Sequence, residues 1–389
     1  MKILFIQKMA GIAGSERYLL SLLPALQQRG VKPTYLLVQN PRDKDKNREF
    51  VSKLEQHGIY VKIMNARLPI SPLLLWEIYR YLRKEKFDLV QSNLIHSDIW
   101  MAFVKCLFLP KLRLVSVKHG YEEAYQTRHG LDPSHVRLSL SFLAHRGSAR
   151  YADAVISISS ALASFYVMTN MVHQDKMLTI PYGFDFSKIK SDPTLEKYRF
   201  SPLQLVVVGR LVPVKQHHVF LPVLAKLVEK FSTLSVVMVG DGPCREALLL
   251  QTKHLNLCQH VHWVGFKNNA HDYIQGSDLM VVPSSAEGFG LVVLEGWYHK
   301  KTVVAFDVPA LNEIIVSEKD GILVKPFNTD ELFDALCHLL ENDERRQELG
   351  AAGHKKLLND YTLESMIERT IAVYETVVHE QTLTLYSSD

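Results

Sequence analysis

The chain has 389 residues, too many for one ordinary hydrophobic core, so we expect two domains. Its 47% hydrophobic and 22% charged residues are typical of a soluble globular protein. No run of eighteen apolar residues occurs, which argues against a membrane-spanning helix. No charged and apolar leader precedes the first predicted strand, so we expect the protein to reside in the cytoplasm.

The net charge of +4 hides a difference between the two halves of the chain. Residues 1–200 contain 29 Lys and Arg against 17 Asp and Glu, a charge of +12, whereas the remaining residues contain 16 against 24, a charge of −8. A basic N-terminal half indicates an anionic partner, such as the inner face of the cytoplasmic membrane or a phosphate-bearing acceptor. A merely solvated surface explains the same charge. We do not expect nucleic acid as a partner.

Strands and helices alternate along the first half of the chain, which predicts a parallel sheet covered by helices. A helix is expected over residues 16–29, a polar loop over 40–48, and a hinge over 180–200. The predicted strands of this half are residues 2–7, 33–39, 88–92, 112–117 and 154–158. Four scattered cysteines, with no CxxC pair, are expected to be buried free thiols: Cys106, Cys244, Cys258 and Cys337.

The second half of the chain repeats the alternation. Its predicted strands are residues 203–209, 234–240, 261–265, 279–282 and 302–306. From Thr329 to about Val378 the chain is predicted to be helical, and a last helix after Tyr361 is expected to pack back on the first domain. The fold class is therefore α/β, with two doubly wound domains facing across a crevice between the carboxyl ends of their strands.

Two glutamates with seven residues between them mark the most informative segment. Glu287 is predicted to lie in the loop after a buried strand, and Glu295 in the helix over residues 291–298. The intervening Gly288 and Gly290 allow a ligand to approach backbone amides at the N-terminus of that helix. Amides suit a phosphate and carboxylates suit hydroxyl groups, so a phosphate-bearing polyol fits such a site.

Two cations follow the first strand of the second domain. Arg210 offers a planar fork to phosphate oxygens, and Lys215 offers a point charge, so together they can neutralise a leaving diphosphate without a metal ion. The pair alone fits a surface role as well. In combination with Glu287 and Glu295, which follow another strand of the same predicted sheet, a functional role is favoured.

The N-terminal half contributes weaker candidates. The loop over residues 11–17 lacks the G-x-G-x-x-G spacing, which disfavours a dinucleotide oxidoreductase, but Gly14 can approach a phosphate. A tight turn with Ser15 near a helix N-cap is the alternative. His119 directly follows a strand, at the sheet edge where ligands bind, whereas His96 fits packing equally well. No G-x-S-x-G elbow supports a hydrolase.

The segment over residues 73–86 is amphipathic and basic. It combines Leu74, Trp76 and Ile78 with Arg80 and Arg83, a pattern that suits a helix at a membrane surface. A crossover helix whose apolar stripe packs on the sheet explains the same pattern.

These motifs, in their order, resemble the retaining glycosyltransferases of family four, which have the GT-B fold. The resemblance extends over nearly the whole chain and rests on residues 11–17, 153–159, 180–185, 209–215, 239–243, 264–266 and 283–295. It implies an acceptor-binding Rossmann-like domain over residues 1–185, a nucleotide-sugar-binding Rossmann-like domain over 186–360, and a C-terminal helix and tail over 361–389 that return to the first domain.

The resemblance also implies roles for individual residues. Glu295 holds the ribose hydroxyls, Glu287 contacts the donor sugar, and His119 orients and supports the reacting sugar electrostatically. The catalytic residues implied are Glu287, His119, Arg210 and Lys215. The donor-binding residues implied are Gly14, Arg210, Lys215, Val264, Phe266, Glu287, Gly288, Phe289, Gly290 and Glu295.

The implied reaction moves a hexose or N-acetylhexosamine from a UDP-sugar or GDP-sugar to a hydroxyl of a glycan or lipid-linked acceptor, in cell-envelope polysaccharide or lipopolysaccharide synthesis. Neither a cofactor nor a metal ion is expected. Retention usually needs a carboxylate nucleophile, but no first-domain carboxylate clearly fills that role, so front-face substitution is the preferred hypothesis. A nucleotide-sugar epimerase of the same fold and a non-catalytic nucleotide-sugar sensor are the alternatives.

The chain departs from the pattern of the family at four places. Gln216 follows Lys215 where glycine is common, and Pro309 and Ala310 replace a usual Gly-Gly pair. Gly296 and Trp297 follow Glu295 where the family has alanine and then a Gly-x-Pro turn, and Asn93 stands where another histidine often lies. We therefore expect a stiffer loop around the donor pocket than in the family.

Overall fold

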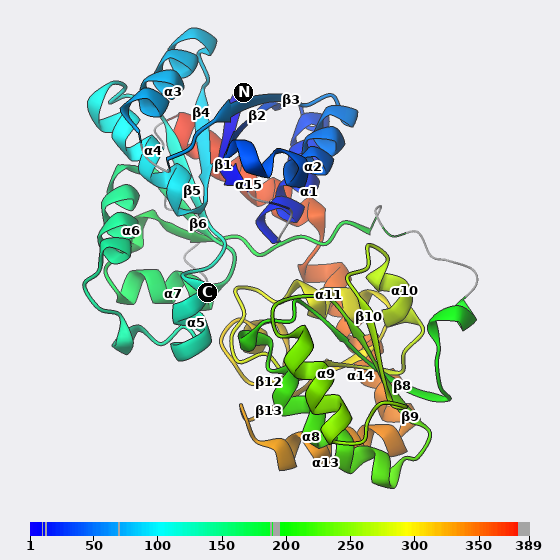
Figure 1. Ribbon diagram of the computed structural model, residues 1–389. Coiled ribbons are helices and arrows are strands. Elements are labelled where there is room, and N and C mark those ends of the chain that lie inside the picture. Colours follow the sequence, from blue (N-terminus) through cyan, green and yellow to red (C-terminus); the bar gives the residue numbers. More distant parts are fainter. Residues whose placement is uncertain (10, 12–13, 69–70, 187–188, 190–194, 380–389) are drawn as a thin grey trace. The chain divides into compact units, whose positions relative to one another are not determined.

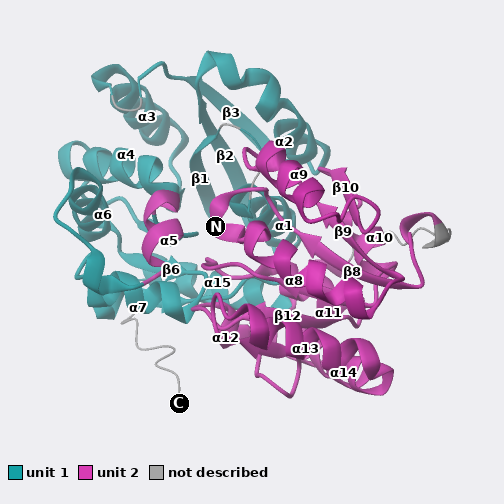
Figure 2. Ribbon diagram, turned by 60° about the horizontal axis from the view of Figure 1, so that its bottom comes forward, with its two compact units in different colours: residues 1–121, 132–183, 363–389 teal, residues 122–131, 184–362 magenta. Residues whose placement is uncertain are grey.

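The computed structural model describes residues 1–9, 11, 14–68, 71–186, 189 and 195–379. Its contacts divide the chain into two compact units, coloured separately in Figure 2. Unit 1 comprises residues 1–121, 132–183 and 363–389, and unit 2 comprises residues 122–131 and 184–362. The predicted tail beyond residue 379 and most of residues 187–194 in the predicted hinge lie outside the described residues.

Unit 1 contains a sheet of seven described strands, all parallel, in the order β3-β2-β1-β4-β5-β6-β7 (Figure 1). The strands are β1 (Lys2–Met9), β2 (Lys32–Gln39), β3 (Tyr60–Asn65), β4 (Leu89–Asn93), β5 (Leu114–Lys118), β6 (Ala154–Ser157) and β7 (Met177–Thr179). Strands β4, β5 and β6 are buried along their whole length, as expected for a sheet covered by helices on both faces.

The helices of unit 1 form two groups. Helix α1 (Gly14–Gln28) contacts α2 (Lys44–Gln56) and the C-terminal α15 (Leu363–Val378), whereas α4 (Leu94–Leu107) contacts α3 (Pro72–Glu85) and α6 (Leu140–Tyr151). Helix α7 (Ser160–Met168) contacts β6 and β7. Tyr374 of α15 is buried, its ring lies 6.5 Å from that of Phe5, and its hydroxyl donates to Gln91 Oε1. The predicted return of the last helix to the first domain is therefore confirmed.

Unit 2 contains a parallel sheet of six described strands in the order β10-β9-β8-β11-β12-β13. Its strands are β8 (Leu203–Val208), β9 (Leu234–Val239), β10 (Val261–Gly265), β11 (Leu279–Val282), β12 (Thr302–Phe306) and β13 (Ile322–Val324). Its helices are α5 (Glu123–His129), α8 (His217–Lys230), α9 (Arg245–His254), α10 (Ala270–Gln275), α11 (Leu291–Tyr298), α12 (Leu311–Ile314), α13 (Thr329–Glu341) and α14 (Asp343–Asp360). Two parallel sheets with helices confirm the predicted α/β class with two doubly wound domains.

Strand order reverses once in each sheet. In unit 1 the reversal lies between β1 and β4, and in unit 2 it lies between β8 and β11. Adjacent crossovers depart in opposite directions there, which leaves an opening at the carboxyl ends of the two strands where ligands of doubly wound folds bind. The loops after β8 and β11 carry Arg210, Lys215 and Glu287, so these residues stand at the switch point of unit 2.

Some local expectations were wrong. The predicted polar loop over residues 40–48 contains the start of α2, because this helix packs through a few apolar positions such as Phe50 and Leu54 and is otherwise polar. The edge strand β3 and the short strands β7 and β13 were not predicted. Cysteine burial was predicted too broadly: all four thiols are free, but Cys106 and Cys258 are exposed.

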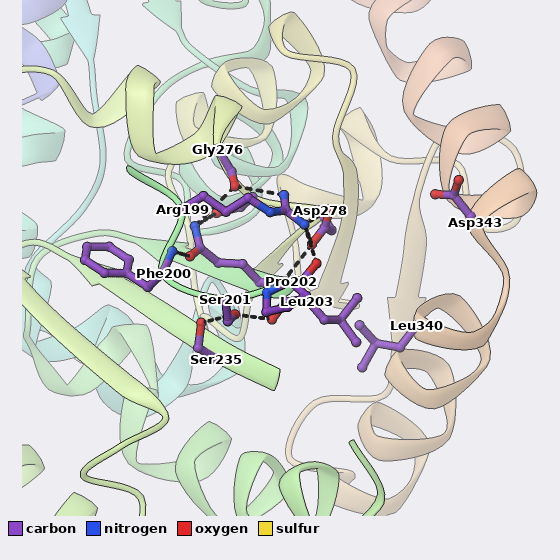
Figure 3. A network of polar contacts seen from close by, with 12 residues as sticks. Arg199, Phe200, Ser201, Pro202, Leu203, Ser235, Gly276, Asp278, Leu340 and Asp343 are labelled. Atoms are coloured by element: carbon purple, nitrogen blue, oxygen red, sulfur yellow. Dashed lines mark hydrogen bonds and ion pairs between the residues drawn. The ribbon is translucent and has the colours of Figure 1, made fainter. Parts of the chain in front are cut away.

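A polar network ties the amino ends of the unit 2 strands together (Figure 3). The guanidinium of Arg199 donates to both carboxylate oxygens of Asp278, at 3.1 and 2.9 Å, and to the carbonyl of Gly276 at 3.2 Å. Asp278 Oδ2 also accepts the backbone N–H of Gln204 at 2.8 Å. The network therefore joins the segment before β8 to the start of β11, at the end of the sheet opposite the switch point.

We expect Arg199→Ala to lower the free energy of unfolding by roughly 1–2 kcal/mol, because Asp278 then keeps only its backbone donor. Chemical denaturation monitored by circular dichroism measures the change. The control is Lys226→Ala, which removes an exposed ion pair with Asp330 and should change stability by about 0.5 kcal/mol or less. Equal effects of the two substitutions would show that the Arg199 network contributes no more than a surface pair.

Candidate functional site

The centre of the unit 2 site is an ion pair between Lys215 and Glu287. Lys215 ends a short turn of 3₁₀ helix after β8, and Glu287 lies in the loop after β11. Lys215 Nζ lies 2.5 Å from Glu287 Oε1, and the two side chains are 19% and 11% exposed. The pair is therefore shielded from bulk water, which strengthens its electrostatic attraction relative to a surface pair.

Backbone contacts hold the two loops of this pair together. The N–H of Ser285 donates to the carbonyl of Val214 at 2.9 Å, and Gln216 Nε2 donates to Ser285 Oγ at 3.1 Å. Val212, Val214 and Ala286 form a buried apolar cluster beneath these contacts. Lys215 and Glu287 are thus positioned by fixed backbone on both sides. Gln216 and Ser285 were not predicted as contributors, because their contact joins residues 69 positions apart.

A positive φ occurs at two positions where the family pattern has glycine, one of them directly after Lys215. Gln216 has φ +52° at the start of α8, and the fully buried Ala310 has φ +72° at the start of α12. Glycine adopts a positive φ without steric cost, which explains why it is usual at both positions. Other L-residues are strained in this conformation. The expectation of a stiffer loop has a physical basis here, since both residues restrict the backbone more than glycine does.

Gly290 is the N-cap of α11, with φ +102°. A Cβ atom at this position would lie 2.6 Å from Leu311 Cδ2, so the backbone angle favours glycine and any larger residue would also have to displace the end of the buried Leu311 side chain. The close approach brings the start of α11, and with it the N–H groups after Glu287, against α12. Glu295 lies on α11 itself, as predicted.

The other predicted donor residues are placed around the same sheet edge. Arg210 follows β8, is exposed, and lies 3.3 Å from Glu123 of α5. Phe289 is buried, with its ring 6.0 Å from that of Tyr361. Val264 lies in β10, and the exposed Phe266 follows it. The structure thus joins Lys215 to Glu287 directly, whereas the ion pair of Arg210 is with Glu123.

His119 and Gly14 belong to unit 1. Gly14 begins α1, so Ser15 is the second residue of that helix, near its N-cap as the alternative had it. The imidazole of His119 lies 2.6 Å from the hydroxyl of Tyr182 through Nδ1 and 3.3 Å from Asn93 Oδ1 through Nε2. The Tyr18 ring packs edge-on against it, with centroids 5.2 Å apart. His119 is therefore half-buried among aromatic and polar side chains, next to the carboxyl end of β4.

The hydrogen bonds define the tautomer of His119. Burial, reinforced by the charge of Lys118, lowers the pKa of His119 to about 3, so its imidazole is neutral and carries one N–H. Asn93 Oδ1 only accepts and already accepts Gln91 Nε2 at 3.0 Å. With the Asn93 amide in this orientation, Nε2 of His119 donates to Asn93 and Nδ1 accepts from Tyr182, whose pKa burial raises well above its ordinary value. Both ring nitrogens are occupied within unit 1.

This chain of contacts continues through Gln91 to Tyr374 of α15, so the C-terminal helix supports the pocket of His119. One charged pair lies nearby: Lys118 Nζ is 2.5 Å from Asp98 Oδ2, and both side chains are 2% exposed. Asp98 Oδ1 accepts the hydroxyls of Ser92 and Ser116, at 2.5 and 2.8 Å. In the sequence, the signal for this pair is Lys118 at the end of the largely apolar strand β5. The pair was not predicted.

Among the described residues, no group of three or more His, Cys, Asp or Glu side chains is placed to hold a metal ion. Likewise, no helix within the described ranges is long and apolar enough to cross a membrane.

We expect Gly290→Ala to lower the free energy of unfolding by roughly 2–3 kcal/mol, through the left-handed backbone and the contact with Leu311. Thermal and chemical denaturation measure the loss. Gly147→Ala, in α6 where a Cβ meets nothing within 4 Å, serves as the control and should not destabilise the protein. A Gly290→Ala protein as stable as the control would contradict the close packing of α11 on α12.

Stability should rise with pH between about pH 4 and 6.5. Burial lowers the pKa of His119, His145 and His299 to about 3 and that of His217 to about 4. Unfolded histidines titrate near 6.5, so the unfolded state binds more protons in this window, and stability is lost as the pH falls. Urea denaturation at several pH values between about 4 and 8 measures the slope. His119→Gln should make the slope shallower; an unchanged slope would mean that His119 binds its proton in the folded protein.

The chain matches known proteins along most of its length. Residues 196–356 match the family model described as glycosyl transferases group 1, and residues 12–188 match the model described as glycosyltransferase family 4. Poly(ribitol-phosphate) alpha-N-acetylglucosaminyltransferase of Staphylococcus aureus is 25% identical over 43% of this chain, and the match covers only 34% of that protein. Lipopolysaccharide core biosynthesis glycosyltransferase LpsD of Rhizobium meliloti is 23% identical over 93% of this chain and 95% of that protein.

Among solved structures, HepE of Anabaena, crystallised in complex with UDP, superposes with a TM-score of 0.81 at 21% identity, covering 97% of this chain and 100% of that chain. At this identity the likeness shows the fold. Together with the two sheets described above, it confirms the predicted GT-B architecture. Because the two family models between them account for residues 12–188 and 196–356, the chain belongs to the glycosyltransferases of family 4 and group 1.

Proposed function

We propose that this protein is a retaining glycosyltransferase that moves a hexose or N-acetylhexosamine from a nucleotide diphosphate sugar to a hydroxyl of a glycan or lipid-linked acceptor. The observation that carries the proposal is the shielded pair of Lys215 and Glu287 at the switch point of unit 2. A cation there suits the diphosphate of a donor, and a carboxylate beside it suits the hydroxyls of the sugar. Glu295 on the adjoining α11 is the carboxylate proposed for the ribose.

The class of substrate is supported by relatives. The structure of HepE contains UDP, and a second structure of that protein contains UDP-glucose. The names of similar proteins include a lipopolysaccharide core glycosyltransferase and a transferase that acts on a diphospho-undecaprenol-linked sugar. We infer a UDP-sugar or GDP-sugar as donor and cell-envelope polysaccharide or lipopolysaccharide synthesis as the setting. Val264 and Phe266, at the end of β10, are the residues proposed to flank the base.

In the proposed reaction, the bond between the anomeric carbon and the diphosphate oxygen breaks first, which leaves an oxocarbenium-like sugar. Lys215 and Arg210 stabilise the charge that develops on the diphosphate, without a metal ion. The acceptor oxygen then bonds to the anomeric carbon from the same face, and its proton passes to a phosphate oxygen. Because both ring nitrogens of His119 are already hydrogen bonded, its proposed role is to position and support the sugar rather than to attack it.

The first experiment measures donor binding by isothermal titration calorimetry with UDP, GDP, ADP and their common sugars, in EDTA and then in magnesium. We expect one nucleotide to bind selectively and without metal. Glu295→Ala should weaken its affinity roughly 10- to 100-fold, the loss of a charged hydrogen bond to the ribose. Glu344→Ala, an exposed carboxylate at the start of α14, is the control and should bind like the wild type.

Turnover separates the proposal from its alternatives. Lys215→Ala should lower kcat roughly 100- to 1000-fold while the fold is retained, because it removes a cation from the leaving group. A product whose sugar keeps the anomeric configuration of the donor, seen by NMR, supports retention, and trapping of a glycosyl ester on an Asp or Glu would exclude the front-face route. Isomerised donor without acceptor would indicate an epimerase, and binding without turnover or slow hydrolysis would indicate a sensor.

A further inference from the structure

Helix α3 has two apolar surfaces, and packing explains only one of them. Leu74, Ile78 and Leu82 form its inner stripe and are 3%, 0% and 4% exposed, so the crossover-helix interpretation accounts for this side. Leu73 and Trp76 point the other way around the helix and are 67% and 48% exposed. An outward-facing tryptophan and leucine contribute nothing to the core of unit 1.

Helix α4 extends this outer surface. Its C-terminal end exposes Phe103, Leu107 and Phe108, the last immediately after the helix. The Phe108 ring lies 6.0 Å from Trp76 and 4.9 Å from Tyr79, so the two helices share one aromatic cluster. Figures 1 and 2 show α3 and α4 side by side in unit 1. We call Leu73, Trp76, Phe103, Leu107 and Phe108 the α3–α4 patch.

A basic rim borders the α3–α4 patch. Four exposed cations follow its apolar residues along the chain: Arg80, Arg83, Lys84 and Lys111. None of them forms an ion pair with another described residue, and Arg83 instead donates to the Tyr79 hydroxyl at 2.7 Å. Glu77 is the only exposed acidic residue among the described residues of α3 and α4, since Asp98 is buried and Glu85 is half-buried beside Lys2. The rim therefore brings four positive charges, against the one exposed carboxylate of Glu77, beside exposed apolar surface.

We propose that the α3–α4 patch docks the protein on the surface of an anionic lipid bilayer. Tryptophan, phenylalanine and leucine enter the boundary between headgroups and acyl chains, while arginine and lysine contact the lipid phosphates. Each cation close to such a surface contributes about 1 kcal/mol, so the four rim residues suffice for reversible binding. The inference concerns a surface distant in sequence from Lys215 and Glu287 and does not depend on the proposed reaction.

Charge favours a membrane over a second copy of the chain as the occupant. In a twofold symmetric dimer through this patch, the same surface faces itself, so the two rims of Arg80, Arg83, Lys84 and Lys111 would be brought together. Like charges across an interface repel, and no exposed carboxylate beyond Glu77 is available on α3 and α4 to offset them. An anionic surface instead complements the entire rim.

The test is flotation of the full-length protein with vesicles of phosphatidylcholine alone or of phosphatidylcholine mixed with phosphatidylglycerol. We expect binding to the anionic vesicles only, weakened by added salt. Arg80→Glu with Arg83→Glu should lower the partition coefficient roughly tenfold or more. Trp76→Ser with Phe108→Ser should also lower it, with less effect on its salt dependence. Circular dichroism confirms that each variant is folded, and the charge-reversal variant remains informative should the aromatic variant unfold.

Matched controls come from unit 2. Lys319→Glu with Lys325→Glu changes the net charge equally at exposed positions, and Leu250→Ser removes a leucine that is 61% exposed. Both control variants should bind vesicles like the wild type. Equal losses in the control and patch variants would overturn the proposal, as would unchanged binding in both patch variants. Light scattering of the lipid-free protein provides a further check: a dimer that the patch substitutions dissociate would assign the surface to a second copy instead.

Discussion

The contact between Lys215 and Glu287 depends on two loops that leave neighbouring strands at the switch point of unit 2. The contacts that fix each loop include contacts with the other loop. Ser285 bonds to the backbone of Val214, Gln216 reaches Ser285, and the buried side chains of Val212 and Ala286 pack below them. The parallel pairing of β8 with β11 sets where both loops begin. A charged pair that is shielded from water is costly to assemble from mobile parts, so these contacts between the two loops keep the two charges together.

The surroundings of His119 in unit 1 differ from the charged pair of unit 2, because they contain neutral hydrogen-bonded side chains. Burial holds the pKa of His119 low and the pKa values of Tyr182 and Tyr374 high, so these side chains are neutral. Hydrogen bonds run from Tyr182 through His119, Asn93 and Gln91 to Tyr374. A neutral network of this kind orients groups without demanding a counter-charge. Asn93, which replaces a histidine of the family, suits it because its amide oxygen accepts from two neighbours at once.

The sequence was most informative about features that depend on neighbouring residues, such as apolar periodicity and the residues that end a strand. The five strands of the second half and the helix over residues 291–298 were predicted within a residue or two, because buried parallel strands are short apolar runs ended by glycine or proline. Strand β3 was missed because it lies at an edge and exposes Tyr60 and Ile63. Contacts such as Lys118 with Asp98 could not be predicted, since they join residues whose proximity only the sheet order determines.

The departures from the family pattern were visible in the sequence, but their meaning required the backbone. Trp297 is the second residue after Glu295, in the segment where the family has alanine and then a Gly-x-Pro turn. The structure buries it completely, with its indole N–H donating to the carbonyl of Asp320 at 2.9 Å. The space comes from α14: a Cβ on Gly353 would lie 2.2 Å from the indole nitrogen, so only glycine fits there. The Trp297 side chain therefore fills the space that the absence of a side chain at Gly353 leaves.

Gln216 and Ala310 differ from Trp297 in kind, because they alter the backbone directly. Each occupies a left-handed conformation that glycine adopts freely, and each stands at the start of a helix beside the candidate donor site. Lys215, Glu287 and Glu295, by contrast, match the family pattern. The chain thus keeps the charged groups and changes the main chain around them. Backbone amides recognise the shape of a ligand, whereas charged side chains recognise its phosphates and hydroxyls. For the function proposed above, we therefore expect these substitutions to affect which sugar and base bind rather than the class of donor.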